Sequence, residues 1–419
     1  MPLLNRTAVE VRAQRPLTIR LAGNPVPVLW LWTRAATWAL ALFSLYVFQG
    51  SRNPQAWRWD DPRLTRDLGD YTDVWARWDS VWFLRIAAHG YHATASPVRA
   101  TAAFPPLYPT LMRWLGRWIG HHAVLAGILI SLAASLVAFL LLYRLADRHL
   151  GADGARRAVL YLAVFPTALF LQAVYSESLY LLLTIAAFLL ADRRRFAAAG
   201  VAAGLAILTR PVGVALLPAL ALLAWRDRHR LRALAGLVLA LPIAAIYPWL
   251  VWRDTGSPWM FAHAEHLWHR HLSPLGPLAG VWNGLRAGWA GIEQVVSGSH
   301  KHAYWTAVPD GDPMHVAAVN LGSLAFLLLF IALTFVVWRR FGAPLGLFSA
   351  LSLAIPLSVP SDGWPLLSIS RFGLGIFPFF LALSWIGGRR PRVHTGIVVV
   401  SSLLLGVAIV QWALWQWVA

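Results

Sequence analysis

Long apolar runs dominate this sequence, such as HHAVLAGILISLAASLVAFLLLY at 121–143 and VAAVNLGSLAFLLLFIALTFVVW at 316–338. A helix of about 20 apolar residues crosses the hydrocarbon layer of a bilayer, and each of these runs is long enough to do so. Hydrophobic residues make up 58% of the chain and charged residues only 13%, too few for the surface of a soluble domain. The sequence therefore predicts an all-α polytopic membrane protein.

Charge and cysteine content exclude several kinds of site. The chain has no cysteine, so it forms no disulfide, thiolate nucleophile or cysteine-based metal site. Its formal net charge is +18, but basic residues in a membrane protein usually encode its orientation in the bilayer. We therefore expect the lipid bilayer as a partner and no nucleic acid.

About eleven membrane spans are expected, in one integral membrane domain over residues 1–419. The three predicted spans between 178 and 225 have about 14 residues each, so they tilt little, thin the bilayer or pack inside the bundle. The predicted spans are 27–48, 121–144, 156–174, 178–191, 196–209, 212–225, 233–252, 315–338, 343–359, 372–387 and 395–417.

Arginine-rich segments alternate along the chain with segments of mixed charge. With the N-terminus inside, the cytoplasmic segments carry 21 basic residues and five acids, counting Arg34, which is expected to snorkel near the start of the first span. These segments are the 1–26 tail, the 144–157 loop, 192–195, 226–232, 338–340 and 387–392. The C-terminus and two long loops, 49–120 and 253–314, are then external, in a protein of the cell membrane.

The first external loop contains two predicted amphipathic helices. DSVWFLRIAAHG begins at Asp79, a candidate N-cap, and ends before Gly90, a residue typical of helix termination. PPLYPTLMRWLGRW begins with prolines and places arginines beside tryptophans. Both are expected to lie in the outer membrane interface.

Six polar clusters interrupt the apolar sequence, and this topology places all of them on the external side. Intramembrane ionisable residues are costly, so a concentration on one face predicts a site there. The clusters are DLGDYTDVWARWDS (67–80), FPPLYP (104–109), YSES (175–178), TRP (209–211), HAEHLWHRH (263–271) and SDGWPLLSISR (361–371).

Each cluster also has a purely structural interpretation. Asp79 caps a helix, Glu177 suits a helix start, and Arg210 and Arg371 anchor to headgroups. The acids Asp67, Asp70 and Asp73 are expected to be solvated. His263, His266 and His269 recur every third residue, a spacing that drifts around a helix, so interfacial histidines are favoured over a metal site.

Five motifs in order resemble the PIG-V family, which adds the second mannose of GPI anchors and has bacterial relatives. RWDSVWFLRIAAHGY matches the family's W-D-x-x-x-F/Y-L-x-I-A-x-x-G-Y segment, and FPPLYP matches its F-x-P-L-Y/F-P element. YSESLYLLLTIAAFLLA, TRPVG and SRFGLGIFPFFLAL follow. Together the motifs cover roughly residues 75–385.

The resemblance implies a GT-C glycosyltransferase fold with a catalytic acid in the first external loop. Donors in this family are polyprenyl-phosphate sugars, mannose here, and transfer inverts the anomeric centre in a single displacement. The composition is typical of a high-GC bacterium, which makes no GPI anchors, so the expected acceptor is another glycan or glycolipid.

The resemblance places Asp79 and Glu177 on motif positions, and the reaction that it implies suggests roles for these acids and for the arginines. Asp79 is the candidate base, made more basic by partial desolvation at the membrane surface. Glu177 is the second candidate catalytic residue, expected to bind sugar hydroxyls, to orient an arginine or to share a metal. Arg210 and Arg371 are expected to hold the donor phosphate. The remaining candidate substrate-binding residues are Arg77, Trp78, whose indole would stack on a sugar, Tyr108 and Tyr175. A divalent metal is left open, because Asp70-x-x-Asp73 is not a D-x-D motif.

Two alternatives to an enzyme are a flippase of polyprenyl-linked sugars and a membrane scaffold. Flippases usually carry ionisable residues near the bilayer midplane and internal repeats, and this sequence shows neither. A scaffold has no need of Asp79 and Glu177 in apolar surroundings. Both features favour a glycosyltransferase.

Overall fold

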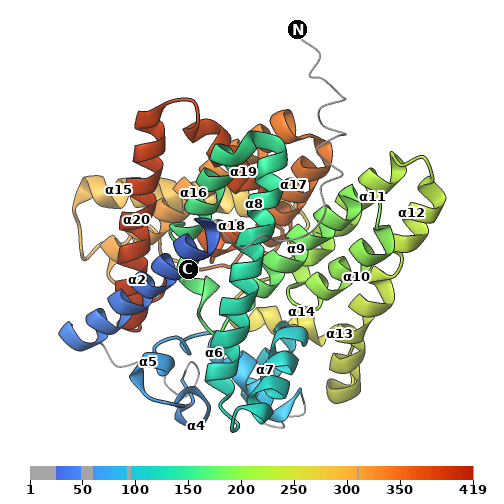
Figure 1. Cartoon of the computed structure of the whole chain (residues 1–419). Helices are drawn as coiled ribbons and strands as arrows, with labels where there is room; N and C mark the ends of the chain where they lie inside the picture. Colours follow the sequence, from blue (N-terminus) through green and yellow to red (C-terminus); the bar gives the residue numbers. More distant parts are fainter. Residues whose placement is uncertain (1–24, 49–59, 92–95, 309–310, 419) are drawn as a thin grey trace.

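The computed structural model describes residues 25–48, 60–91, 96–308 and 311–418, and these residues fold almost entirely into helices (Figure 1). Within these ranges the extended pairing is a single isolated bridge between Arg270 and Ser361. The α-helices are α2 Pro25–Val47, α4 Pro62–Thr65, α5 Asp70–Asp73, α6 Ser80–His89, α7 Leu107–Trp118, α8 Ala123–Ala163, α9 Glu177–Asp192, α10 Phe196–Ile207, α11 Leu216–Trp225, α12 Arg230–Leu237, α13 Ala240–Thr255, α14 Met260–Ala264, α15 Pro277–Ser297, α16 Pro313–Phe341, α17 Ala343–Leu357, α18 Ile369–Leu374, α19 Pro378–Gly387 and α20 Pro391–Ala413. Short 3₁₀ helices are η1 Ser96–Ala103, η2 Ala168–Leu171, η3 Pro211–Ala215 and η4 Glu265–Trp268.

Helix length and composition confirm the prediction of an all-α membrane protein. Five stretches of the described chain are long and apolar enough to cross a membrane: α2, α8, α12 with α13, α16 and α20. Four shorter apolar helices accompany them: α10, η3 with α11, α17 and α19. The total of eleven spans remains a prediction. Residues 1–24 of the predicted cytoplasmic tail lie outside the described residues.

Three predicted boundaries are wrong. The 144–157 segment is not a loop, because α8 continues through it with one break at Gly151, whose φ is 72°. The span expected over 156–174 is α-helical only to Ala163, and a buried segment of turns and the 3₁₀ helix η2 follows, with Pro166 three residues beyond α8. The span expected over 372–387 is broken at 375–377, where Pro378 starts the new helix α19.

Arg34 explains how the buried segment after α8 is tolerated inside the bundle. The Arg34 side chain does not snorkel toward the cytoplasm as predicted, since the residue is only 3% exposed. Its guanidinium donates to the carbonyl oxygens of Ala163, at 2.9 Å, and Ala168, at 2.7 Å. Carbonyls at a helix end lack helical partners and are costly to bury unpaired, so Arg34 satisfies a requirement that the sequence pattern does not reveal.

We expect Arg34→Met to lower the free energy of unfolding by about 1–3 kcal/mol for each buried carbonyl left unpaired. Methionine has a similar length and donates no hydrogen bond. Arg286→Met on the exposed face of α15 is the matched control. Thermal unfolding in detergent micelles measures the difference, and equal stability of the two variants would show that the contacts contribute nothing.

The 49–120 segment, predicted to be the first external loop, contains both predicted helices, α6 and α7. Gly90 ends α6 with a φ of 69° and donates to the carbonyl of Ile86, as expected. Contrary to prediction, α6 is not a surface helix, because seven of its ten residues are buried under neighbouring segments of the loop. Helix α7 does expose Trp114 and Trp118, the aromatic face expected at an interface.

Two acids of this loop are structural rather than solvated. The Asp67 carboxylate contacts His122 and accepts from the backbone N–H of Leu125, at 3.2 Å, so it stabilises the first turn of α8. Asp73 is buried and accepts from the backbone N–H of Asp67, at 2.9 Å. Only Asp70 is exposed as predicted.

Helix α15 was missed in the second long loop. A stripe of small residues explains its packing, since a Cβ at Gly280, Gly284 or Gly288 would collide with Leu357, Leu366 or Leu324. Small residues at such a spacing let helices approach closely in membrane proteins. The four-residue spacing of these glycines is the sequence feature from which a closely packed helix could have been predicted.

In α9 and α17, arginine-rich segments and the polar ends that face the cavity lie at opposite ends of the same helix. Helix α9 starts at Glu177 and ends before Arg193–Arg195, and α17 starts just after Arg339 and Arg340 and ends at Leu357. An ion pair between Arg148 and Asp192, at 3.6 Å, ties α8 to α9 at the arginine-rich end. In Figure 1, α4–α7 gather at one end of the molecule and α10–α13 form one side.

Candidate active site

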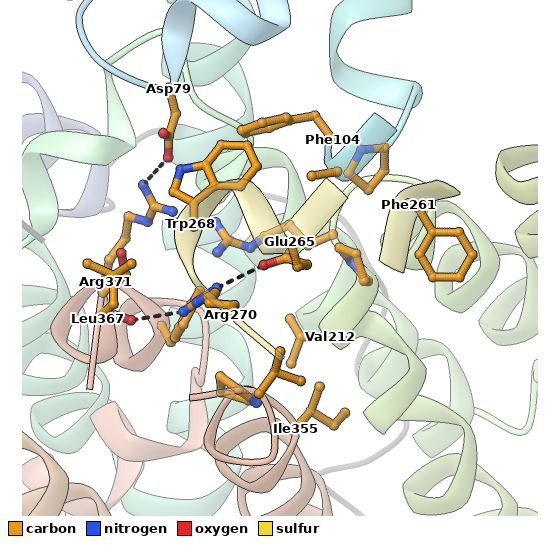
Figure 2. A pocket seen from close by; sticks show the side chains of 18 of the residues that line it. Asp79, Phe104, Val212, Phe261, Glu265, Trp268, Arg270, Ile355, Leu367 and Arg371 are labelled. Atoms are coloured by element: carbon orange, nitrogen blue, oxygen red, sulfur yellow. Dashed lines mark hydrogen bonds and ion pairs between the residues drawn. The ribbon is translucent and has the colours of Figure 1, made fainter. Parts of the chain in front are cut away.

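A cavity of about 530 Å³ opens where the segments that carry the polar clusters meet. All six polar clusters contribute to its wall, so residues from 79 to 371 converge on one space. The wall includes Asp79, Phe104, Glu177, Arg210, Glu265, Trp268, Arg270, Arg371 and, beyond the six clusters, Val212, Ile355 and Trp417. Figure 2 shows Asp79 and Phe104 at one end of the view and Val212 and Ile355 at the other.

Arg371 joins the two predicted carboxylates. Its Nη1 donates to Oδ2 of Asp79 at 2.8 Å (Figure 2). Its Nε lies 3.3 Å from Oε1 of Glu177. A second arginine, Arg210, pairs closely with the same Oε1 of Glu177. All four side chains are largely shielded from solvent, and buried charges persist only when paired, so the cluster is held by mutual neutralisation.

The acids set the protonation state of Arg371. Burial alone would lower the pKa of this guanidinium, but Asp79 and Glu177 outweigh that effect and raise it above the ordinary arginine value. Arg371 also lies over the rings of Phe170 and Tyr175, at 5.5 and 5.4 Å. It is therefore a permanently charged, fixed cation in the cavity.

Glu265 and Arg270 form a second ion pair that the sequence analysis did not select. The Arg270 Nη1 lies 3.4 Å from Oε2 of Glu265, and its Nη2 donates to the carbonyl of Leu367 at 3.1 Å (Figure 2). Both residues belong to the HAEHLWHRH cluster, for which only the histidine spacing was interpreted from the sequence. The cavity thus contains three arginines and three carboxylates, with formal charges that balance.

Tyr175 fixes the backbone at Asp79. The backbone N–H of Asp79 donates to the Tyr175 hydroxyl at 3.0 Å, and that hydroxyl donates to the carbonyl of Arg77 at 3.4 Å. Burial and the nearby Asp79 charge raise the pKa of Tyr175 well above its ordinary value, so the hydroxyl stays protonated. Tyr175 lines the cavity and acts on Asp79 as a positioning residue.

Asp79 occupies the N-cap position of α6, but its carboxylate makes no capping hydrogen bond. The predicted capping role of the side chain is therefore wrong, because the carboxylate turns toward Arg371 instead. Its second oxygen, Oδ1, and Oε2 of Glu177 are buried without a hydrogen-bond partner in the described structure. Buried acceptors are normally satisfied, so these two oxygens are suited to accept from a bound substrate.

Three other predicted substrate-binding residues lie outside the cavity wall. Arg77 donates to the carbonyls of Trp412, at 3.0 Å, and Ala413, at 2.6 Å. Trp78 packs edge-on against Trp417, at 5.1 Å, so its indole serves a protein contact. Tyr108 is fully buried and donates to the carbonyl of Gly127, at 2.9 Å, between α7 and α8. In this structure the three side chains therefore contact other parts of the protein, and none of them lines the cavity.

The histidine cluster does not form a single helix. Helix α14 ends at Ala264, η4 follows, and His269 has a left-handed φ of 54°. His263 and His266 line the cavity, whereas His269 does not. Across the residues that the structure describes, no three histidine or carboxylate side chains are grouped closely enough to hold a metal ion.

Comparison with known proteins gives one family match and several remote structural likenesses. The family model described as dolichyl-phosphate-mannose-protein mannosyltransferase matches residues 104–252, just over a third of the chain. No curated protein matches the sequence.

Two solved structures illustrate the structural likenesses. ArnT from Cupriavidus metallidurans, bound to undecaprenyl phosphate, is 16% identical with a TM-score of 0.38, covering 85% of this chain and 77% of that one. The oligosaccharyltransferase AglB from Archaeoglobus fulgidus, in complex with an inhibitory peptide and a dolichol-phosphate, is 13% identical with a TM-score of 0.40. That match covers 90% of this chain but only 56% of AglB.

Proposed function

We propose that this protein is a GT-C-type membrane glycosyltransferase. It moves a hexose, in our proposal mannose, from a polyprenyl-phosphate donor to a glycan or glycolipid on the external face of the cell membrane. The observation that carries the proposal is Arg371, which bridges Asp79 and Glu177 inside a cavity that all six external clusters line. The ordered PIG-V-like motifs and the partial family match support the same reaction class.

The charges of the cavity suit the departure of a phosphate. A polyprenyl-phosphate sugar is a diester with one negative charge, and its leaving phosphate gains a second. Arg210 and Arg371 line the cavity together with Arg270, and guanidinium groups bind phosphate oxygens in two-pronged geometry. We assign these arginines to the phosphate, where they stabilise the charge that develops as the sugar departs.

Asp79 is assigned as the base. The acceptor hydroxyl gives its proton to Asp79, its oxygen forms the new bond to the anomeric carbon, and the bond from that carbon to the phosphate oxygen breaks. Attack opposite the leaving group inverts the anomeric configuration. Oδ1 of Asp79 has no protein partner in the described structure, so it is the oxygen suited to receive this proton.

The Asp79–Arg371 ion pair implies an order of binding. In the absence of donor, Arg371 holds the other oxygen of the base at 2.8 Å. A donor phosphate competes for Arg371 and weakens its contact with Asp79, which strengthens Asp79 as a base. The donor therefore binds before the acceptor hydroxyl is activated.

The test of this function uses purified protein in nanodiscs with radiolabelled donor and a membrane glycolipid extract as acceptor. We expect mannose to be transferred from polyprenyl-phosphate mannose and not from a nucleotide sugar. Polyprenyl-phosphate glucose in a parallel reaction tests the choice of hexose. Transfer from the nucleotide sugar would contradict the donor class, and movement of the lipid donor across the bilayer without transfer would identify a flippase.

A further inference from the structure

The last residues of α20 and those that follow it lie against the loop that carries Asp79. We call residues 412–417 the tryptophan segment, because it contains Trp412, Trp415 and Trp417. The Trp412 indole donates to the carbonyl of Val74 at 2.6 Å, and Arg77 donates to the carbonyls of Trp412 and Ala413. These hydrogen bonds join residues more than 330 positions apart in the sequence, so the segment is firmly docked.

Aromatic packing extends this contact to the residue before Asp79. The Trp78 ring makes T-shaped contacts with the rings of Trp415, at 5.9 Å, and Trp417, at 5.1 Å. The Arg77 guanidinium lies 4.7 Å from the centre of the Trp415 ring. Trp412 is almost fully buried, whereas Trp417 is only partly buried.

Trp417 is the member of the segment that reaches the cavity. It lines the same space as Asp79, and its contact with Trp78 places it at the Asp79 end. The other end is apolar, with Val212 and Ile355 (Figure 2). An acceptor must bring its hydroxyl to Asp79, so its sugar ring enters the cavity that Trp417 lines.

We propose that Trp417 forms the platform of the acceptor subsite and binds a pyranose ring through its apolar face. This inference rests on the proposed function, in which Asp79 is the base. An indole presents a broad apolar face and a polar N–H edge, which suits a sugar with C–H groups on one face and hydroxyls around its rim. The docked segment holds that face in place before the acceptor arrives, which reduces the entropic cost of binding.

The experiment compares Trp417→Ala and Trp417→Phe with Trp282→Ala, a control that removes a tryptophan 61% exposed on α15. We expect Trp417→Ala to raise KM for the acceptor about tenfold or more, the loss of roughly 1.4 kcal/mol of binding. KM for polyprenyl-phosphate mannose should stay within twofold. Trp417→Phe should recover most of the loss, and Trp282→Ala should match the wild type.

The proposal is wrong if Trp417→Ala leaves KM for the acceptor unchanged. It is also wrong if KM for the acceptor and KM for the donor rise equally. A second measurement is independent of turnover: saturation-transfer NMR with methyl mannoside as the probe. Wild type should give a signal that Trp417→Ala loses and Trp417→Phe keeps. If wild type transfers no sugar but shows this pattern, the proposed function fails, while the binding of a pyranose ring by Trp417 stands. If wild type gives no signal, the platform is wrong whatever the transfer assay shows.

Discussion

Mannose transfer by the Asp79→Asn variant is expected to fall by about 10²–10⁴-fold, the range associated with loss of a general base. Asparagine has nearly the same shape and keeps an oxygen that accepts from Arg371, but it takes up no proton at neutral pH. Arg371 retains its contact with Glu177, so the variant should remain folded. Initial rates with polyprenyl-phosphate mannose and saturating acceptor measure the loss.

The matched control for this variant is Asp70→Asn, the same substitution at an exposed acid of the same loop. Its rate should equal that of the wild type. Near-normal transfer by Asp79→Asn would remove Asp79 as the base. A loss of transfer accompanied by a lower unfolding temperature would point instead to a structural role for its ion pair.

Arg371→Lys should reduce kcat by about 10²–10³-fold, the loss typical when one donor to a developing oxyanion is removed. A guanidinium presents Nη1 to Asp79 and Nε to Glu177 simultaneously, while a lysine ammonium is a single point charge. The conservative substitution keeps the positive charge, so the cavity stays neutral. It removes the planar group that we assign to the phosphate.

Arg371→Gln removes the charge as well and should be more severe. It leaves Asp79 and Glu177 in a buried space without their shared cation, a change that typically costs about 3–5 kcal/mol of stability. Arg113→Lys on the exposed side of α7 is the control for the lysine variant. A kcat within twofold of the wild type in Arg371→Lys would exclude Arg371 from the chemical step.

Periodic and compositional features were predictable because they depend on short stretches of sequence. The apolar runs gave the class and most helix positions, and small deviations arose where a proline or glycine interrupts a run, as at Gly151 and Pro378. Helix α15 was missed because its small residues face Leu324, Leu357 and Leu366, partners that lie far away in the chain. The buried α6 was placed at the surface for the same reason.

The candidate site was predictable only to the level of its clusters. Charged and aromatic residues in apolar surroundings marked all six, since such residues are costly in a membrane without a function. Nothing local distinguished Arg371, which contacts both acids, from Arg77, which binds carbonyls of the tryptophan segment. Both are arginines beside aromatic residues.

The sequence by itself determined the class of the protein, the positions of most helices and the polar clusters, because hydrophobicity and charge act residue by residue. Tertiary structure alone decided which acids meet which arginines, that Arg34 satisfies the end of α8, and that Trp417 joins the wall beside Asp79. Those pairings join residues up to hundreds of positions apart in the sequence. The partner of a buried charge or carbonyl depends on which groups lie within hydrogen-bond distance once the helices have packed.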